Sequence, residues 1–227
     1  MLIEQITQED NFVEGVNDPA IFKAIFLSGG PGSGKSFVAN KLLSGLGMKT
    51  INSDDIYEYL ASKQDLDLRD PDAIASPQGQ EVRNRAKKLS DKKQKSHLDG
   101  RLGVIIDGTG KNVDKVSKHS AVLKSLGYET MMLFVNTSEE VSQQRNQERP
   151  RVLRRDVVSS MWKQVQSNIM KFQQIFGAKD FHIVDNSGGL EDPTRADNFK
   201  QVEKAVRAFV KSPVRNRIAK KWVQDNS

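Results

Sequence analysis

Eight residues near the start of the chain combine the residue types that proteins use to hold a polyphosphate. Residues 29–36 read Gly-Gly-Pro-Gly-Ser-Gly-Lys-Ser and satisfy the pattern G-x-x-x-x-G-K-[ST]. Glycines let main-chain N–H groups point inward around an anion, Lys35 can reach the β- and γ-phosphates, and the Ser36 hydroxyl can ligate Mg²⁺. The predicted phosphate-binding residues are Gly29, Gly30, Pro31, Gly32, Ser33, Gly34, Lys35 and Ser36. We therefore expect the chain to bind a nucleoside triphosphate.

The sequence on either side of this pattern supports the prediction. An apolar run at 24–27 precedes it, and a helix-like stretch at 37–43 follows it. A helix that begins directly after the loop presents its positive N-terminal end to a bound anion. The alternative is a glycine-rich turn that merely precedes a lysine, and the strand before and the helix after it disfavour that alternative.

Two acidic positions come directly after apolar, strand-like segments. Residues 51–55 read Ile-Asn-Ser-Asp-Asp, and carboxylates at this place lie at the sheet edge where a phosphate-binding loop also emerges. We interpret Asp54 as a base that orients an attacking hydroxyl and accepts its proton; the alternative is helix N-capping by Ser53 or Asp54. Asp107 ends another apolar segment, where it could hold Mg²⁺ through water or only cap the turn at Gly108.

Five arginines lie close together in the second half of the chain. They are Arg145, Arg149, Arg151, Arg154 and Arg155. Planar guanidinium groups on a closing loop stabilise the charge that spreads over a γ-phosphate during transfer, and such a loop also excludes water. Pro150 interrupts the helix that carries Arg145, which suits a lid better than a regular element. An ordinary solvated basic loop is the alternative.

Strand-like apolar runs alternate with helical patterns, which predicts a parallel sheet covered on both faces. The predicted strands are 21–27, 48–52, 102–107, 130–135 and 181–184. The clearest predicted helix is 156–176, and Gly177 is predicted to end it. Its apolar stripe, which we expect to face the core, consists of Trp162, Val165, Ile169, Phe172 and Phe176. The stretch 62–80 is predicted to be an irregular insertion that covers a substrate or is simply a mobile loop.

Composition narrows the classes of protein. The 227 residues suit one α/β domain, and the lack of cysteine excludes disulfide frameworks, thiolate zinc sites and cysteine nucleophiles. The three histidines are too scattered to suggest a metal cluster. No apolar run approaches membrane-spanning length, and the acidic start does not resemble a secretory leader. We therefore expect a soluble, cytoplasmic protein with no membrane partner.

Other classes of protein with a phosphate-binding loop fit the sequence less well. Residues 107–110 read Asp-Gly-Thr-Gly and formally match the Asp-x-x-Gly of a GTPase switch. However, no Asn-Lys-x-Asp segment follows to read guanine; the only Asn-Lys pair, at 40–41, continues into two leucines. A ring ATPase or motor needs a longer chain with further arginine-finger and sensor segments. A compact kinase remains.

Two basic regions bear on the binding partner, in a chain whose net charge is +6. The stretch 83–101 holds eight positive residues against two aspartates, and 215–221 holds four near Trp222. The positive residues are Arg83, Arg85, Lys87, Lys88, Lys92, Lys93, Lys95, Arg101, Arg215, Arg217, Lys220 and Lys221. Such regions can track a nucleic-acid backbone, but a lysine-rich helical face is usually only solvated. Nucleic-acid contact stays open on this evidence.

Five motifs follow one another in a defined order. They read Gly-Gly-Pro-Gly-Ser-Gly-Lys-Ser (29–36), Ile-Asn-Ser-Asp-Asp (51–55), Val-Ile-Ile-Asp-Gly-Thr-Gly-Lys-Asn (104–112), Arg-Asn-Gln-Glu-Arg-Pro (145–150) and Asp-Val-Val-Ser-Ser-Met-Trp (156–162). Between about Phe22 and Phe176, this order resembles that of phage polynucleotide 5′-kinases and zeta-toxin-type kinases.

The resemblance carries expectations for the fold and the site. It implies a sheet with the strand order 2-3-1-4-5, a nucleobase loop near 185–189 and Asp54 as the general base. It also implies that Arg145 and Arg149 are lid arginines. One departure is Tyr57, because the polynucleotide kinase pattern has an arginine three residues after the catalytic aspartate.

These features predict an α/β P-loop NTPase fold of the nucleotide-kinase type, with three α/β/α layers and a five-stranded parallel sheet. We expect one kinase domain over 1–227, with a motif-bearing core at 21–185 and a basic helical tail at about 193–227. The predicted activity is ATP- and Mg²⁺-dependent transfer of a γ-phosphate to a hydroxyl of a nucleic-acid 5′ end, a modified DNA base, a nucleoside or a nucleotide sugar. The predicted catalytic residues are Lys35, Asp54, Arg145 and Arg149, and the predicted metal ligands are Ser36 and Asp107. The rival hypothesis is a nucleotide switch or ATPase that acts through a partner.

Overall fold

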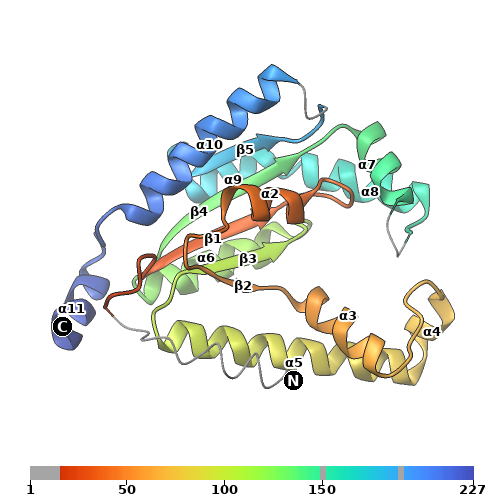
Figure 1. Cartoon of the computed structure of the whole chain (residues 1–227), viewed down its shortest axis with the longest axis horizontal. Coiled ribbons are helices and arrows are strands. Elements are labelled where there is room, and N and C mark those ends of the chain that lie inside the picture. Colours follow the sequence, from red (N-terminus) through yellow and green to blue (C-terminus); the bar gives the residue numbers. More distant parts are fainter. Residues whose placement is uncertain (1–15, 149–151, 189–191) are drawn as a thin grey trace.

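Five parallel strands form one sheet at the centre of the computed structural model, which describes residues 16–148, 152–188 and 192–227 (Figure 1). The strands are β1 (Lys23–Ser28), β2 (Lys49–Ile51), β3 (Val104–Gly108), β4 (Glu129–Asn136) and β5 (Phe181–Asp185). Their order across the sheet is β2-β3-β1-β4-β5, so the predicted order is confirmed. The carboxyl ends of all five strands therefore meet at one edge of the sheet.

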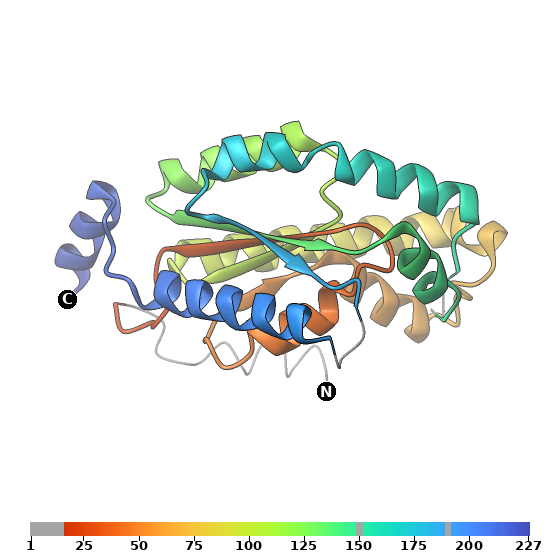
Figure 2. The same cartoon turned by 90° about the horizontal axis from the view of Figure 1, so that it is seen from above.

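Ten helices connect and cover the strands in the part of the chain that the structure describes. They are α2 (Lys35–Leu42), α3 (Ser53–Lys63), α4 (Pro71–Ala75), α5 (Pro77–Asp99), α6 (Val113–Ser125), α7 (Glu139–Gln147), α8 (Arg155–Gln166), α9 (Ile169–Phe176), α10 (Pro193–Lys211) and α11 (Arg217–Asn226). The helices lie on both faces of the sheet, so the predicted three-layer arrangement is confirmed (Figure 2).

Each face of the sheet buries its own hydrophobic core. In β1, Ile25 and Leu27 point to the core that α2 and α10 cover, whereas Ala24 and Phe26 point to the core on the side of α6 and α9. Successive side chains of a strand alternate between faces, so a strand buried on both sides must be apolar at nearly every position. This requirement explains why the strands read as unbroken apolar runs.

The predicted helix at 156–176 is wrong in one respect, because the structure has two helices, α8 and α9, in its place. A turn at Ser167 and Asn168 separates them. The Asn168 side chain is only 4 % exposed, and its Nδ2 donates to the carbonyls of Gly110 (3.0 Å) and Lys111 (3.1 Å). These hydrogen bonds to a distant part of the chain fix the turn. The sequence does not predict the turn, because the apolar spacing continues through it and no proline interrupts it.

Four of the five residues of the predicted apolar stripe lie in or against the core, whereas Trp162 lies outside it and its Nε1 donates to the Thr137 carbonyl (2.8 Å). Val165, Phe172 and Phe176 are buried, and Ile169 packs against them. Gly177 ends α9 with a φ of 80°, as expected of a helix-terminating glycine.

The stretch 62–80, predicted to be irregular, is partly helical. It contains the end of α3, all of α4 and the first turn of α5. Asp70 and Ser76 cap α4 and α5, and each cap is followed by a proline at the first helical position. A proline suits this position because its missing N–H has no partner in the first turn, and this capping pattern is the signal that the sequence analysis overlooked.

A smaller hydrophobic cluster joins α3 to α5 beyond the β2 edge of the sheet. It consists of Tyr57, Leu60, Ala61, Val82 and Ala86. The cluster holds the two helices together as an arm that projects from the sheet (Figure 1).

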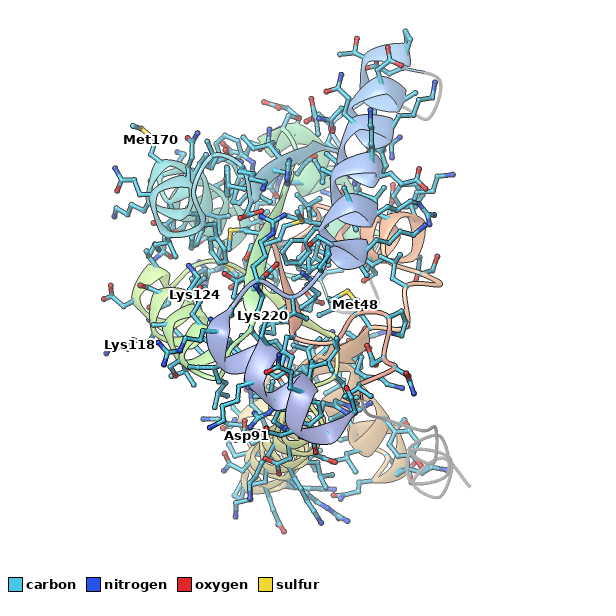
Figure 3. The ribbon with its side chains drawn as sticks, turned by 90° about the vertical axis from the view of Figure 1, so that its left-hand side faces the viewer. Met48, Asp91, Lys118, Lys124, Met170 and Lys220 are labelled. Atoms are coloured by element: carbon cyan, nitrogen blue, oxygen red, sulfur yellow. The ribbon has the colours of Figure 1, made fainter. Side chains whose placement is uncertain are left out.

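The C-terminal segment is tied to the sheet at the end opposite the phosphate-binding loop. Lys23 Nζ donates to Glu129 Oε2 (2.6 Å) and to Ser212 Oγ (2.9 Å), and the main-chain N–H of Arg215 donates to Glu129 Oε1. Lys220 of α11 lies at this end together with Lys118 and Lys124 of α6 (Figure 3). None of the described helices is both long and apolar enough to cross a membrane.

Candidate active site

The loop between β1 and α2 curves tightly because two of its glycines adopt left-handed backbone conformations. Gly32 has a φ of 71° and Gly34 a φ of 82°. A Cβ added at Gly32 would overlap the Ser142 carbonyl oxygen, and one added at Gly34 would overlap Asn186 Nδ2. Both positions therefore need glycine for conformation and for space. The phosphate-binding pattern thus forms the expected strand–loop–helix unit.

Two side chains from distant parts of the chain hold this loop. Ser142 Oγ of α7 donates to the Pro31 carbonyl (2.5 Å), and Asn186 Nδ2, directly after β5, donates to the Ser33 carbonyl (2.7 Å). Asn186 Oδ1 in turn accepts from Arg195 Nη2 (2.6 Å), and Arg195 is only 8 % exposed. The sequence analysis missed these three residues. The position of Asn186 at the end of a strand was the only local signal.

We expect Asn186→Ala to weaken ATP binding about tenfold, because a buried bond to the loop is lost and its partners stay unpaired, at about 1–3 kcal/mol. Titration of a fluorescent ATP analogue measures the effect. Asn40→Ala, a matched change at an exposed position of α2, is the control and should leave the affinity unchanged. Equal affinities for the two variants would show that the loop does not depend on Asn186.

Lys35 lies at the start of α2 and bends over the loop that precedes it. Its Nζ donates to the Gly29 carbonyl (2.9 Å), and its charge acts on the carboxylate of Asp107. Ser36, the next residue, is exposed at the N-terminal end of the same helix. Both side chains therefore lie at the loop that the sequence predicts to bind a polyphosphate and its cation.

Asn52, rather than Ser53 or Asp54, caps α3. Its Oδ1 accepts from the Asp54 main-chain N–H (2.8 Å), and its Nδ2 donates to Asp55 Oδ1 (2.9 Å) and Asp107 Oδ2 (3.1 Å). The capping alternative for the Asp54 carboxylate is therefore wrong. Asn52 joins the ends of β2 and β3, and sequence reasoning missed this role.

Asp107 is a buried carboxylate at the end of β3. Burial raises its pKa, the charges of Asp55 and Asp54 raise it further, and Lys35 opposes the shift. Its Oδ1 is buried without a hydrogen-bond partner among the described residues. A buried acceptor of this kind fits a bound cation or its water. No group of three or more metal-binding side chains occurs in the described ranges, so a cation here would depend mainly on Ser36, water and phosphate oxygens.

Arg145 of α7 lies beside the loop. Its Nη1 is 3.5 Å from the Cβ position of Gly34 and is buried without a hydrogen-bond partner in the described part of the chain. Burial lowers the pKa of this guanidinium, and the neighbouring Arg195 lowers it further. A guanidinium nitrogen in this setting favours an incoming anion.

None of the other arginines of the cluster is shown beside the phosphate-binding loop. Arg149 and Arg151, together with Pro150, lie outside the described residues, so the lid role of Arg149 stays a prediction. Arg154 forms an exposed ion pair with Asp156 (2.5 Å), and Gln143 Nε2 donates to the carbonyl of Arg155 (2.8 Å).

A cavity of about 600 Å³ opens beside these carboxylates, between α3, α5, the end of β3 and the start of α6. Asp54 and Asp107 line it, together with Ser28, the residue that precedes the phosphate-binding loop. Its size suits a small-molecule ligand or one nucleotide unit of a longer one. The site thus consists of a phosphate-binding loop and a neighbouring cavity; Asp54 and Asp107 line the cavity, and Lys35 of the loop acts on Asp107.

This arrangement defines a P-loop kinase-like domain: a parallel sheet of this order, the loop after its central strand, and acidic side chains at the neighbouring strand ends. Residues 25–171 match the family described as AAA domain (AAA_33), and the chain belongs to this family. A search of curated protein sequences finds no significant match.

Three solved structures share the fold at low sequence identity. A chain from the PezAT chromosomal toxin–antitoxin system of Streptococcus pneumoniae is 17% identical, with a TM-score of 0.61 over 91% of this chain and 95% of that one. A chain of the AvrRxo1-ORF1:ORF2 complex with ATP is 13% identical (TM-score 0.54; 99% and 86% covered). A chain of the Pnkp1/Rnl/Hen1 RNA repair complex is 20% identical (TM-score 0.51), with 72% of this chain and 48% of that one covered.

Proposed function

We propose that the protein is a phosphotransferase that moves the γ-phosphate of ATP to a hydroxyl group of an acceptor bound in the cavity. The observation that carries the proposal is the position of Asp54. It lines the cavity, lies close enough to Asp107 to raise that residue's pKa, and is not the cap of its own helix. A carboxylate that lines a cavity beside a phosphate-binding loop suits a group that activates an acceptor hydroxyl.

Each residue has a defined role in this reaction. The amides of the loop and Lys35 bind the phosphates, and Asp54 accepts the hydroxyl proton while the hydroxyl oxygen forms its bond to the γ-phosphorus. The bond from that phosphorus to the oxygen bridging to the β-phosphate breaks, and ADP leaves. Arg145 neutralises charge on the transferred group. Ser36, and Asp107 through water, would hold Mg²⁺, which supplies further neutralisation of the phosphate oxygens when bound.

The similar structures support the proposal but do not identify the acceptor. One contains ATP, one belongs to a toxin–antitoxin system and one to an RNA repair complex. At 13–20% identity these likenesses concern the fold. We also propose that the described segments form a single domain, because the Lys23–Glu129–Ser212 contacts tie the C-terminal segment to the sheet.

A transfer assay with γ-labelled ATP and Mg²⁺ tests the function. Oligonucleotides with a 5′-hydroxyl, hydroxymethylated DNA, nucleosides and UDP-N-acetylglucosamine are offered in parallel as acceptors. We expect label to appear on one of these hydroxyl compounds. Release of inorganic phosphate alone, with every acceptor unlabelled, would favour an ATPase or nucleotide switch.

A further inference from the structure

Another cavity, of about 710 Å³, lies at the amino ends of β4 and β5, and we call it the distal cavity. Helices α9 and α10 and the connection from α10 to α11 form its sides, and α11 lies at the end of the sheet opposite α7 (Figure 1). Its volume suits a small-molecule ligand. No residue of the phosphate-binding loop lines it, nor does Asp54 or Asp107, so a ligand here would not compete with ATP.

Part of the lining of the distal cavity is apolar. Met131 of β4, Phe176 of α9 and Phe209 of α10 line it, and each is less than a tenth exposed. Ala205 and Ala208 line it from α10 with small side chains that leave the space open. Burial of apolar surface contributes roughly 25 cal/mol per Å². The lining therefore favours a ligand with an aromatic or aliphatic body.

Three cations from separate segments line the same cavity. They are Lys124 of α6, Lys179 in the connection before β5 and Arg215 after α10. Lys124 Nζ donates to the Ile175 carbonyl (3.3 Å). In the part of the chain that the structure describes, none of the three cations forms an ion pair with a carboxylate. Their charges are therefore available to a ligand.

Two carboxylates of the described chain line the distal cavity, Glu129 and Asp180. Glu129 is already paired with the buried Lys23 at 2.6 Å. Three cations then face one uncommitted carboxylate, which leaves a surplus of two positive charges. This surplus favours a ligand that carries two negative charges.

His182 of β5 adds an unpartnered polar atom to this lining. Its Nε2 is buried without a hydrogen-bond partner within the described ranges. An imidazole N–H can donate to an oxygen anion, and such a bond removes the cost of leaving the nitrogen unpaired. Asn216, which caps α11, also lines the cavity, so the positive N-terminal end of that helix lies beside it.

We propose that the distal cavity binds a phosphate monoester with an aromatic or aliphatic body, whose phosphate group contacts Arg215, Lys179 and His182. A phosphate monoester carries a charge of about −1.5 to −2 at pH 7, which matches the surplus of positive charge, whereas a carboxylate carries only one charge. Its oxygens also accept from donors on several segments at once. This site is separate from the ATP and acceptor sites of the proposed function.

Calorimetry of the full chain with 1-naphthyl phosphate tests the inference. We expect a dissociation constant at least about tenfold lower than for 1-naphthoate, which has the same body with a carboxylate, and than for inorganic phosphate, which lacks the body. Lys35→Met should bind the probe as the wild type does. Equal affinity for the probe and either comparison compound, or loss of binding in Lys35→Met, would overturn the inference.

Variants of two lining residues locate the phosphate group. Arg215→Met removes the charge but keeps the main-chain N–H that donates to Glu129, so the C-terminal segment stays tied to the sheet. It should raise the dissociation constant of 1-naphthyl phosphate about tenfold. His182→Phe keeps a ring without the nitrogen and should raise it about threefold. Lys211→Met is the control, because Lys211 is exposed in the last turn of α10 and does not line the cavity.

A bulky substitution at the edge of the cavity tests the place of the ligand's body. Ala208 is exposed and lines the cavity, so Ala208→Trp fills space without entering the core and should abolish binding. Ala121→Trp, at an exposed position of α6 outside the cavity, is the matched control, and thermal unfolding establishes that all variants fold. Equal binding by Arg215→Met and Lys211→Met, equal binding by the two tryptophan variants, or no binding by the wild type contradicts the inference. Since calorimetry measures binding without phosphate transfer, the result is independent of the proposed function.

Discussion

Replacing Asp54 with asparagine is expected to lower kcat for phosphate transfer by about 10²- to 10⁴-fold, the usual contribution of a positioned base. The change keeps the size and shape of the side chain and removes the carboxylate that we propose accepts the hydroxyl proton. The phosphate-binding loop holds ATP without Asp54, so the dissociation constant of ATP should stay within about twofold of the wild-type value. Transfer to the acceptor found in the assay gives kcat, and titration of an ATP analogue gives the affinity.

Glu58→Gln provides the matched control for this variant. Glu58 is an exposed carboxylate one turn further along α3 and does not line the cavity. Its substitution should leave both kcat and affinity unchanged. If Asp54→Asn transfers phosphate at the wild-type rate, the assigned base is wrong.

Replacing Lys35 with methionine is expected to weaken ATP binding by about 10- to 100-fold and to reduce transfer by at least a further 10²-fold. Methionine keeps much of the apolar stem but loses the charge that we propose contacts the β- and γ-phosphates. The further loss in transfer arises because negative charge develops on the γ-phosphate oxygens in the transition state. Lys35 also acts on the buried Asp107 carboxylate, so the variant removes the cation that counters the rise of that pKa.

Lys41→Met is the control, since Lys41 is exposed in the last turn of the same helix. The affinity for an ATP analogue and the transfer rate are compared for both variants, together with their thermal unfolding. If Lys35→Met binds ATP as tightly as Lys41→Met does, the loop does not grip the phosphates as proposed.

The fold was largely predictable because its determinants are local. Apolar runs such as 24–27 predict strands buried on both faces, and the repeats of three and four in 156–176 predict a helical core face. Asn168 shows the limit of this reasoning. The break between α8 and α9 depends on its bonds to the carbonyls of Gly110 and Lys111, which lie 57 or 58 residues away in the chain.

The candidate site also has features that local sequence predicts and features that depend on distant residues. The sequence by itself determined the phosphate-binding loop, because glycine conformations, the lysine and the serine all lie within eight consecutive residues. It also placed Asp54 and Asp107 at strand ends. The sequence did not reveal the hydrogen bonds that hold the phosphate-binding loop in place. Ser142 is 111 residues from Pro31, and Asn186 is 153 residues from Ser33.

Only the tertiary structure decided which side chains line the cavity beside Asp54 and Asp107. The sequence showed a run of positive charges at 83–101, with no means of separating Arg83 from Arg85. Helix α5 turns Arg83 toward Tyr57 and the cavity and leaves Arg85 outside it. The physical reason is that a helix distributes consecutive residues around its axis. The face of α5 that lines the cavity is set by the packing of Val82 and Ala86 against α3, a contact between two separate helices.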